Sequence, residues 1–192
     1  MTEEQFEEWS QEDVRAEWVD GEVILLSPAN IPHIRLNRWL WIILQTMVEF
    51  DDSGEVLGIE AQIRLEGVIQ RREPDLVFVS NSRSHIIHGT YIDGPPDLIV
   101  EIVSPDSQVR DWHDKYIAYE TSGVREYWVI DPGSRRVEAF SLGRAGKFSR
   151  IKEIDGRIRS KVIRRFYLRP EWIWKTPLPK LPAIFKELGL RG

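Results

Sequence analysis

The 192-residue sequence contains no cysteine and no apolar stretch of the length that a membrane span requires. The lack of cysteine excludes a disulfide scaffold, a zinc site with thiolate ligands and a cysteine nucleophile. A transmembrane helix needs about 20 consecutive apolar residues, so we expect no membrane partner. The first thirty residues are acidic and contain no apolar segment, so we also expect no signal peptide. Together these absences predict a protein of a reducing, cytoplasmic environment.

The sequence also has no excess of positive charge, since its formal net charge is -5. This charge argues against a protein that binds nucleic acid through bulk charge alone. The charges are unevenly spread, because residues 1–22 carry nine acidic residues and one Arg, whereas residues 143–169 carry ten basic and two acidic residues. The second stretch is either a solvated face or a basic surface that contacts phosphates. The length and the ordinary globular composition predict one domain over residues 1–192.

Hydrophobic periodicity and turn signals predict an α/β chain that begins with a helix and a hairpin. The pair Asp20-Gly21 separates two β-prone runs, which is a strong hairpin signal. Residues 80–94 give weak signals and predict a loop, and the Pro- and Trp-rich tail 170–192 predicts an extended wrap before a last helix. The predicted helices cover 2–13, 32–49, 107–121 and 183–188. The predicted strands cover 16–19, 22–26, 55–65, 75–79, 97–103, 126–130, 135–142 and 147–151.

Two carboxylates stand out because each lies in or beside a short apolar strand. Asp75 begins the run PDLVFV, and Glu101 lies near the end of the run LIVEIV. A charge inside a buried strand is costly unless it is paired or bound to a metal. If the two strands are neighbours, both carboxylates can face one spot, where hard oxygen ligands suit Mg²⁺. The alternative is that each carboxylate caps a strand end or forms a structural ion pair with an Arg.

Lys115 lies on the predicted helix that follows Glu101 after a short turn, so its ammonium can reach back over the end of the strand. In that position a lysine can stabilise a developing hydroxide or the charge on a phosphate. The alternative is that Asp111 and Lys115 form a pair four residues apart on a solvated helix face. Tyr119 lies on the same face, where packing is the simpler explanation for it.

These residues together resemble the PD-(D/E)XK nuclease superfamily and, more narrowly, its Uma-type (Uma two) family of restriction endonucleases. The matching stretches run in the order of that family over about residues 14–140. They are WVDGEVILLSPA, EPDLVFVS, PPDLIVEIVSPDS and GVREYWVIDP, together with His33 at the start of the long helix and the spaced Asp111, Lys115 and Tyr119.

The resemblance implies a restriction-endonuclease-like core, in which a central mixed β-sheet is flanked by helices. It implies that Asp75 and Glu101 are the two acids of the site and that the carbonyl of Ile102 is a backbone metal ligand. The usual lysine position of the E-x-K motif holds Val103 in this chain. The family is thought to have moved this lysine to the next helix, where Lys115 matches.

Two further residues are weaker candidates for the site. Glu17 matches a family position that would supply another acid near the metal, although a hairpin carboxylate is more often solvated. His33 would contact phosphate or act as an outer base, although a histidine at a helix start is more often part of a cap. The remaining histidines, His85, His88 and His113, show no metal-ligand spacing.

We therefore expect a metal-dependent endonuclease, a hydrolase that cleaves phosphodiester bonds in DNA with Mg²⁺, or Mn²⁺ as a substitute. The sequence leaves the oligomeric state open, and a homodimer is one option because two cuts on duplex DNA suit two-fold symmetry. One alternative is a catalytically silent nucleic-acid-binding or regulatory module on a nuclease fold. A second alternative is a structural protein whose acids are ion pairs, which a separation of Asp75 and Glu101 beyond about 10 Å would favour, because one ion cannot bridge that distance.

Overall fold

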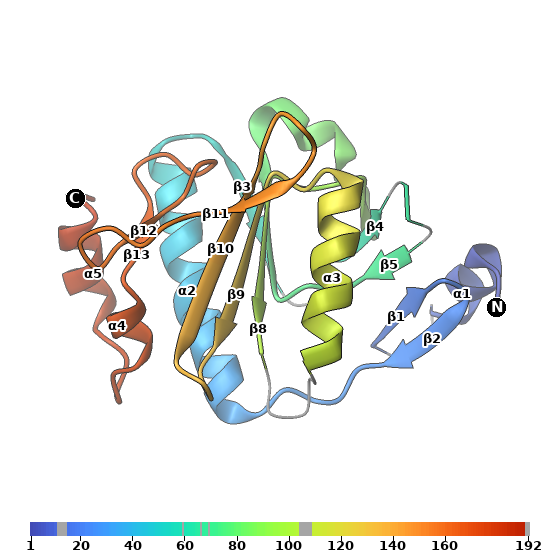
Figure 1. Cartoon of the computed structure of the whole chain (residues 1–192), viewed down its shortest axis with the longest axis horizontal. Coiled ribbons are helices and arrows are strands. Elements are labelled where there is room, and N and C mark those ends of the chain that lie inside the picture. The colour runs from blue at the N-terminus through green and yellow to red at the C-terminus, as the bar shows by residue number, and fades with distance from the viewer. Residues whose placement is uncertain (11–14, 59, 66, 69, 104–108, 191–192) are drawn as a thin grey trace.

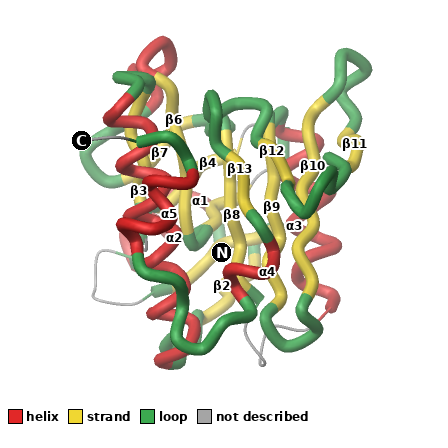
Figure 2. Tube along the Cα trace, turned by 90° about the vertical axis from the view of Figure 1, so that its left-hand side faces the viewer, coloured by secondary structure: helices red, strands yellow, loops and turns green. Residues whose placement is uncertain are grey.

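A computed structural model of the chain describes residues 1–10, 15–58, 60–65, 67–68, 70–103 and 109–190. In this part of the chain the largest sheet has six strands. Across the sheet they are β11 (Phe148–Arg150), β10 (Arg136–Leu142), β9 (Glu126–Asp131), β8 (Leu98–Ile102), β6 (Leu76–Ser80) and β3 (Gly54–Leu57). β8 and β9 are parallel, and the other neighbouring strands are antiparallel. Figure 2 shows these strands following one another from β11 on the right to β3 on the left.

Two helices cover opposite faces of this sheet, α2 (Ile31–Phe50) on one side and α3 (Val109–Ser122) on the other (Figure 1). The alternation along β8 divides its side chains between the two faces. Leu98, Val100 and Ile102 join the core beneath α2, whereas Ile99 joins the core beneath α3. Glu101, which follows the same alternation as Ile99, therefore points toward α3.

The start of α2 is fixed by its sequence. Asn30 accepts a hydrogen bond from the backbone N–H of His33 with its side chain, and Pro32 lies in the first turn. The buried face of the helix is apolar at helical spacing, as expected. Its buried apolar residues are Leu36, Trp39, Leu40, Ile43, Leu44, Met47 and Val48.

A second sheet has the order β2 (Glu22–Leu25), β1 (Ala16–Val19), β5 (Gln70–Arg72), β4 (Gln62–Leu65) and β7 (Tyr91–Asp93). The predicted hairpin is confirmed, because β1 and β2 pair and Asp20 and Gly21 both have positive φ at the turn. α1 (Glu3–Trp9) packs Phe6 against Trp18 of this hairpin. Residues 11–14, at the end of the predicted helix 2–13, lie outside the described residues.

The prediction of one strand over 55–65 is wrong. The chain leaves the large sheet after β3 and enters the second sheet as β4, and Glu60 between them has a φ of 80°. Gly58 lies against Trp41, since a Cβ there would stand 3.4 Å from the indole, at van der Waals contact. The region 80–94, predicted as a loop, contains the 3₁₀ helix η1 (Asn81–Ile86) and β7.

The C-terminal segment packs over α2. It contains the strands β12 (Ile158–Arg159) and β13 (Tyr167–Leu168) and the helices α4 (Pro170–Ile173) and α5 (Leu181–Glu187). Trp39 of α2 donates a hydrogen bond to the carbonyl of Pro179 at 2.9 Å, and its ring meets that of Trp172 edge-on. The expected final helix is confirmed, whereas α4 and the β12–β13 pair were not predicted. No helix among the described residues combines the length and apolar character that crossing a membrane requires.

Candidate active site

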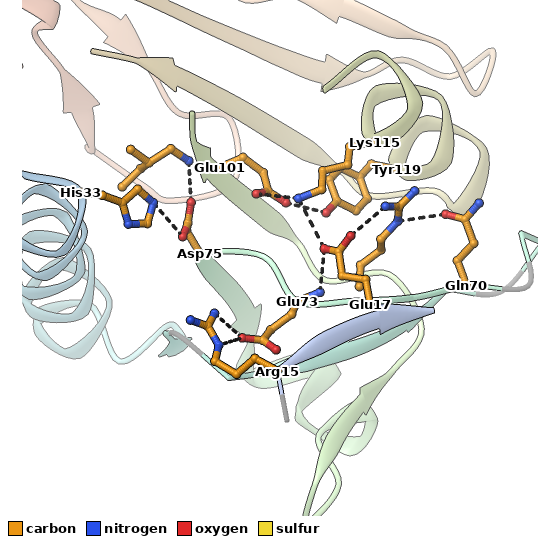
Figure 3. Close-up of polar contacts among 11 residues, drawn as sticks. Arg15, Glu17, His33, Gln70, Glu73, Asp75, Glu101, Lys115 and Tyr119 are labelled. Carbon is orange, nitrogen blue, oxygen red and sulfur yellow. Dashed lines mark hydrogen bonds and ion pairs between the residues drawn. The ribbon is translucent and has the colours of Figure 1, made fainter. Parts of the chain in front are cut away.

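The two predicted acids lie at adjoining strand ends of the large sheet. β6 and β8 pair so that Leu76 stands opposite Val100. Continuing this antiparallel register by one residue brings Asp75 opposite Glu101, and opposed residues project to the same side of a sheet. The charge of Asp75 adds to the effect of burial in raising the pKa of Glu101, as expected for neighbouring carboxylates. The structure thus brings together the two residues that the sequence proposed as metal ligands (Figure 3).

Asp75 is held from the side of α2. Its Oδ2 accepts a hydrogen bond from the backbone N–H of Ile102 at 2.6 Å, and its Oδ1 lies 3.1 Å from Nε2 of His33. One helical turn after His33, the side chain of Asn37 donates a hydrogen bond to the carbonyl of Asp75 at 3.2 Å. His33 and Asn37 thus fix both the carboxylate and the backbone of Asp75, and Asn37 was not among the predicted site residues.

Glu101 is held from the side of α3. Lys115 donates a hydrogen bond to Oε2 at 3.1 Å, and the hydroxyl of Tyr119 donates one to Oε1 at 2.7 Å. Both donors lie on one face of α3, one turn apart, and both are buried. Lys115 therefore points toward the carboxylates, as the sequence predicted. The side chain of Asp111, the alternative partner of Lys115, lies outside the described residues, as does the turn at 104–106.

Glu17 reaches the same place from the N-terminal hairpin. Its Oε2 accepts a hydrogen bond from Arg72 at 2.8 Å, and its Oε1 accepts one from the backbone N–H of Glu73 at 3.2 Å. The ammonium of Lys115 lies 3.4 Å from Oε1. Lys115 thus stands between the carboxylates of Glu17 and Glu101 (Figure 3). Glu73, in turn, accepts a hydrogen bond from Arg15 at 2.6 Å.

The site is electrostatically asymmetric. Burial raises the pKa of Glu101, the charge of Lys115 opposes that shift, and the charges of Asp75 and Glu17 add to it, so that the pKa is about 7. Burial also acts to raise the pKa of Glu17, but the charges of Lys115 and Arg72 outweigh it and lower this pKa. Burial and the neighbouring Glu101 raise the pKa of the Tyr119 hydroxyl. A further positive charge would therefore stabilise the carboxylate form of Glu101.

The donor set at this place fits a small divalent cation. Asp75 and Glu101 offer carboxylate oxygens at adjoining strand ends, and burial, with a smaller contribution from the charges of Asp75 and Glu17, raises the pKa of Glu101, so a cation would favour its carboxylate form. Within the described part of the chain, no group of three or more His, Asp or Glu side chains is placed to hold a metal ion. Two carboxylates with water, a backbone carbonyl and substrate oxygens are the donors that Mg²⁺ takes in such sites. The carbonyl of Ile102 as a ligand stays a prediction.

The remaining histidines and several residues of the basic stretch 143–169 make contacts outside the candidate site. His85 and His88 line a separate cavity of about 350 Å³ with Arg83 and Asp93. His113 is exposed on α3. Several basic residues within 143–169 form ion pairs in the protein itself, which favours the solvated-face interpretation for those residues. These pairs are Lys147–Glu120, Arg150–Glu138, Arg165–Asp51 and Arg169–Glu187.

The residues that the sequence did not suggest are polar and buried. Asn37 and Arg72 are 4% and 2% exposed, and both contact an acid of the site. Asn37 interrupts the apolar face of α2 four residues after His33, and this spacing is a usable signal. Arg72 lies in the run Gln70-Arg71-Arg72, where no hydrophobic alternation marks a strand, so the sequence carries no comparable signal.

The fold and the sequence each match known proteins. A crystal structure described as "a putative nuclease belonging to DUF820" from Anabaena variabilis ATCC 29413 superposes with a TM-score of 0.76 at 16% sequence identity. The match covers 91% of this chain and 97% of that one, and at this identity it shows a shared fold. No curated protein matches the sequence. The family model Uma2, described as "Putative restriction endonuclease", matches residues 3–162. The chain therefore belongs to the Uma2 family, as the resemblance predicted.

Proposed function

We propose that this protein is a metal-dependent endonuclease that hydrolyses phosphodiester bonds in DNA. The observation that carries the proposal is the meeting of Asp75, Glu101 and Lys115, in which the lysine ammonium lies 3.1 Å from Glu101. Membership of a family described as restriction endonucleases supports the same reaction class. In the proposed site Asp75 and Glu101 hold Mg²⁺, or Mn²⁺ in its place, with the carbonyl of Ile102 as a further ligand.

The metal would lower the pKa of a bound water and neutralise charge on the scissile phosphate. The protein supplies the orientation. His33, Asn37 and the N–H of Ile102 hold Asp75, while Tyr119 holds Glu101. These contacts fix the two carboxylates, so a metal that they hold would be placed in advance where negative charge develops in the transition state.

Lys115 is proposed to act on the reacting atoms. Its ammonium lies beside Glu101, so it can donate a hydrogen bond to the attacking water or to a non-bridging phosphate oxygen. As the water oxygen bonds to phosphorus and the ester P–O bond breaks, negative charge gathers on the phosphate oxygens. The positive charge of Lys115 stabilises that charge more in the transition state than in the ground state.

We also propose a domain organisation, an oligomeric state and a cellular location for the protein. Residues 1–192 act as one domain, since the C-terminal residues Trp172, Ile184 and Leu190 join the core that contains α2. A homodimer would place two such sites on the two strands of a duplex. Analytical ultracentrifugation measures that state directly, and cell fractionation tests the proposed cytoplasmic location.

The decisive experiment compares cleavage by the wild type, Glu101→Gln and Glu55→Gln from parallel preparations. Glu55 is an exposed carboxylate on β3 and serves as the matched control. With Mg²⁺ or Mn²⁺, the wild type and Glu55→Gln should cut DNA, a chelator should stop them, and Glu101→Gln should lose most of the rate. Equal cleavage by all three would mean that another protein or another site carries the reaction. No cleavage by any of them, on DNA and RNA substrates, would favour the catalytically silent module.

A further inference from the structure

We infer that Glu17 and Arg72 are positioning residues that hold Lys115 at the site, and that Glu17 is not a metal ligand. The inference rests on the proposed function, in which Lys115 acts on the water or the phosphate. It departs from the expectation that Glu17 is a further acid around the metal. Its basis is the set of contacts that Glu17 makes on the hairpin side of the site.

Both carboxylate oxygens of Glu17 face donors of the protein, as those of Asp75 and Glu101 do, but the partners of Glu17 include two side chains with full positive charge, Arg72 and Lys115. Arg72 donates to Oε2, and the N–H of Glu73 donates to Oε1 while Lys115 lies 3.4 Å from the same oxygen. The side chains of Glu17 and Arg72 are each only 2% exposed. Two cationic groups already neutralise this buried carboxylate. A metal ligand of this kind would have to give up contacts whose loss leaves buried charges unpaired.

The pairing of the strands determines this arrangement. β1 and β5 are antiparallel, with Trp18 opposite Arg71 and Val19 opposite Gln70. One further step in this register sets Glu17 opposite Arg72, so the two side chains project to the same face of the sheet. Arg72 also donates a hydrogen bond from Nε to the side chain of Gln70 at 3.1 Å. The position of Glu17 is therefore set by the pairing of β1 with β5 and by the guanidinium of Arg72, which Gln70 holds in place.

Lys115 needs a second partner because it projects from a helix and not from the strand that carries the acid. In an E-x-K motif the lysine shares a strand with the acid, and the sheet limits its position. Here the strand position holds Val103, and the lysine projects from α3 on a flexible four-carbon stem. Holding that stem in one conformation costs side-chain entropy, which a second ionic partner offsets. Glu17 is that second partner, so the N-terminal hairpin becomes part of the site.

The test separates positioning from metal binding with Glu17→Gln. Glutamine keeps the acceptor for the N–H of Glu73 and removes the charge that faces Lys115. We expect kcat for DNA cleavage to fall by about 100-fold, as misplaced catalytic groups do. The affinity for Mn²⁺ without DNA, measured by calorimetry, should stay within about twofold of wild type, whereas loss of a true ligand such as Glu101 lowers it by at least ~10-fold. A similar loss of Mn²⁺ affinity in Glu17→Gln would identify Glu17 as a ligand and overturn the inference.

A double-mutant cycle tests whether Glu17 acts through Lys115. Lys115→Ala alone and Lys115→Ala with Glu17→Gln should have the same kcat, because the second change has nothing left to position. Independent, multiplying losses would contradict the inference. Arg72→Lys keeps the positive charge but lacks the several N–H donors of the planar guanidinium, and it should retain more activity than Arg72→Met. If Arg72→Met fails to fold, Arg72→Met combined with Glu17→Gln removes both buried charges, and its kcat should match that of Glu17→Gln alone.

The control variant is Arg71→Met, which removes the neighbouring buried arginine of β5. Arg71 pairs with Glu3 and Glu7 of α1, on the other face of the strand, so kcat and Mn²⁺ affinity should be unchanged. A crystal structure of Glu17→Gln gives a readout that needs no activity, and the ammonium of Lys115 should shift from its place between positions 17 and 101. An ammonium that keeps its wild-type position would refute the inference. An inactive wild type whose lysine moves in the variant would instead refute the proposed function alone.

Discussion

His33 places its Nε2 3.1 Å from Oδ1 of Asp75, and it does so from the helix on the opposite face of the sheet to the one that holds Glu101. The two acids of the site are therefore positioned by different layers of the protein. α2 supplies His33 and Asn37 for Asp75, whereas α3 supplies Lys115 and Tyr119 for Glu101. A change in the packing of either helix on the sheet would move one acid relative to the other.

Asn37→Leu should destabilise the protein by about 1–3 kcal/mol, because it leaves the buried carbonyl of Asp75 without this donor. The free energy of unfolding in urea measures the effect. Arg35→Leu, which introduces the same side chain at an exposed position of α2, should change that free energy by less than about 0.5 kcal/mol. Equal stability of Asn37→Leu and wild type would show that the hydrogen bond contributes little to Asp75.

The stability of the metal-free protein should depend on the protonation of Glu101. The pKa of Glu101 is raised from 4.5 to about 7 in the folded chain, so proton binding stabilises the folded state fully below pH 4.5. That contribution is lost as the pH rises from about 4.5 to about 7. Glu101→Gln cannot lose it, so the Tm of the variant relative to wild type should rise across this window. The full change is on the order of 3 kcal/mol.

This prediction concerns the change with pH, because the difference in stability between glutamine and a protonated Glu101 is the same at each pH. Differential scanning calorimetry at several pH values, with chelator present, provides the measurement. Glu55→Gln, at an exposed position, should show no such trend relative to wild type. A constant difference in Tm between Glu101→Gln and wild type from pH 4.5 to 8 would contradict the raised pKa.

The affinity for the metal should also depend on the protonation of Glu101, and it should rise with pH. In the proposed site the metal-bound form requires the carboxylate of Glu101, whose pKa is about 7, so binding should release a proton at lower pH. Mn²⁺ affinity should fall about tenfold for each pH unit below ~7 and should level off above it. Calorimetric titrations in buffers of different ionisation enthalpy count the released protons. Affinity that is constant between pH 5.5 and 8 would show that Glu101 does not bind the ion.

Trp172→Ala should reveal how far the C-terminal segment contributes to the core. Trp172 is 3% exposed and packs against the rings of Trp39 and Tyr167. Its truncation should cost about 3–5 kcal/mol of unfolding free energy. Ile154→Ala, at a residue that is 63% exposed, should have almost no effect. A small effect of Trp172→Ala, with two separate unfolding transitions, would instead show that the tail folds apart from the rest.

Much of this fold was predictable because local signals agree with the tertiary structure. The apolar face of α2 and the turn Asp20-Gly21 each predicted an element to within one or two residues. The central strand was predictable from its apolar run, and the lone acid in it marked the site. The pairing of strands was less predictable from the sequence. The strand of Gln70, Arg71 and Arg72, for example, has no apolar pattern and is stabilised by its pairing with β1 and β4.

The residues of the candidate site also differ in how far the sequence predicts them. The acids and Lys115 could be proposed because each is unusual for its local surroundings. Arg72 could not, because its role depends on the register between β1 and β5, which no periodicity in the sequence reports. The resemblance suggested Glu17 as a further acid near the metal, and the structure gives it an arginine and a lysine as partners.

The distance along the chain between Glu17 and its partners has a consequence during protein synthesis. Arg72 follows Glu17 by 55 residues, and Lys115 comes later still. At about 5–20 residues per second, the ribosome needs several seconds to supply Arg72 and longer to supply α3. Throughout that time the nascent hairpin carries a carboxylate without its counter-ions, and Glu101 has not met its lysine. Hydrolytic capacity in the proposed site therefore cannot exist on a partly made chain and arises only when α3 docks onto the sheet.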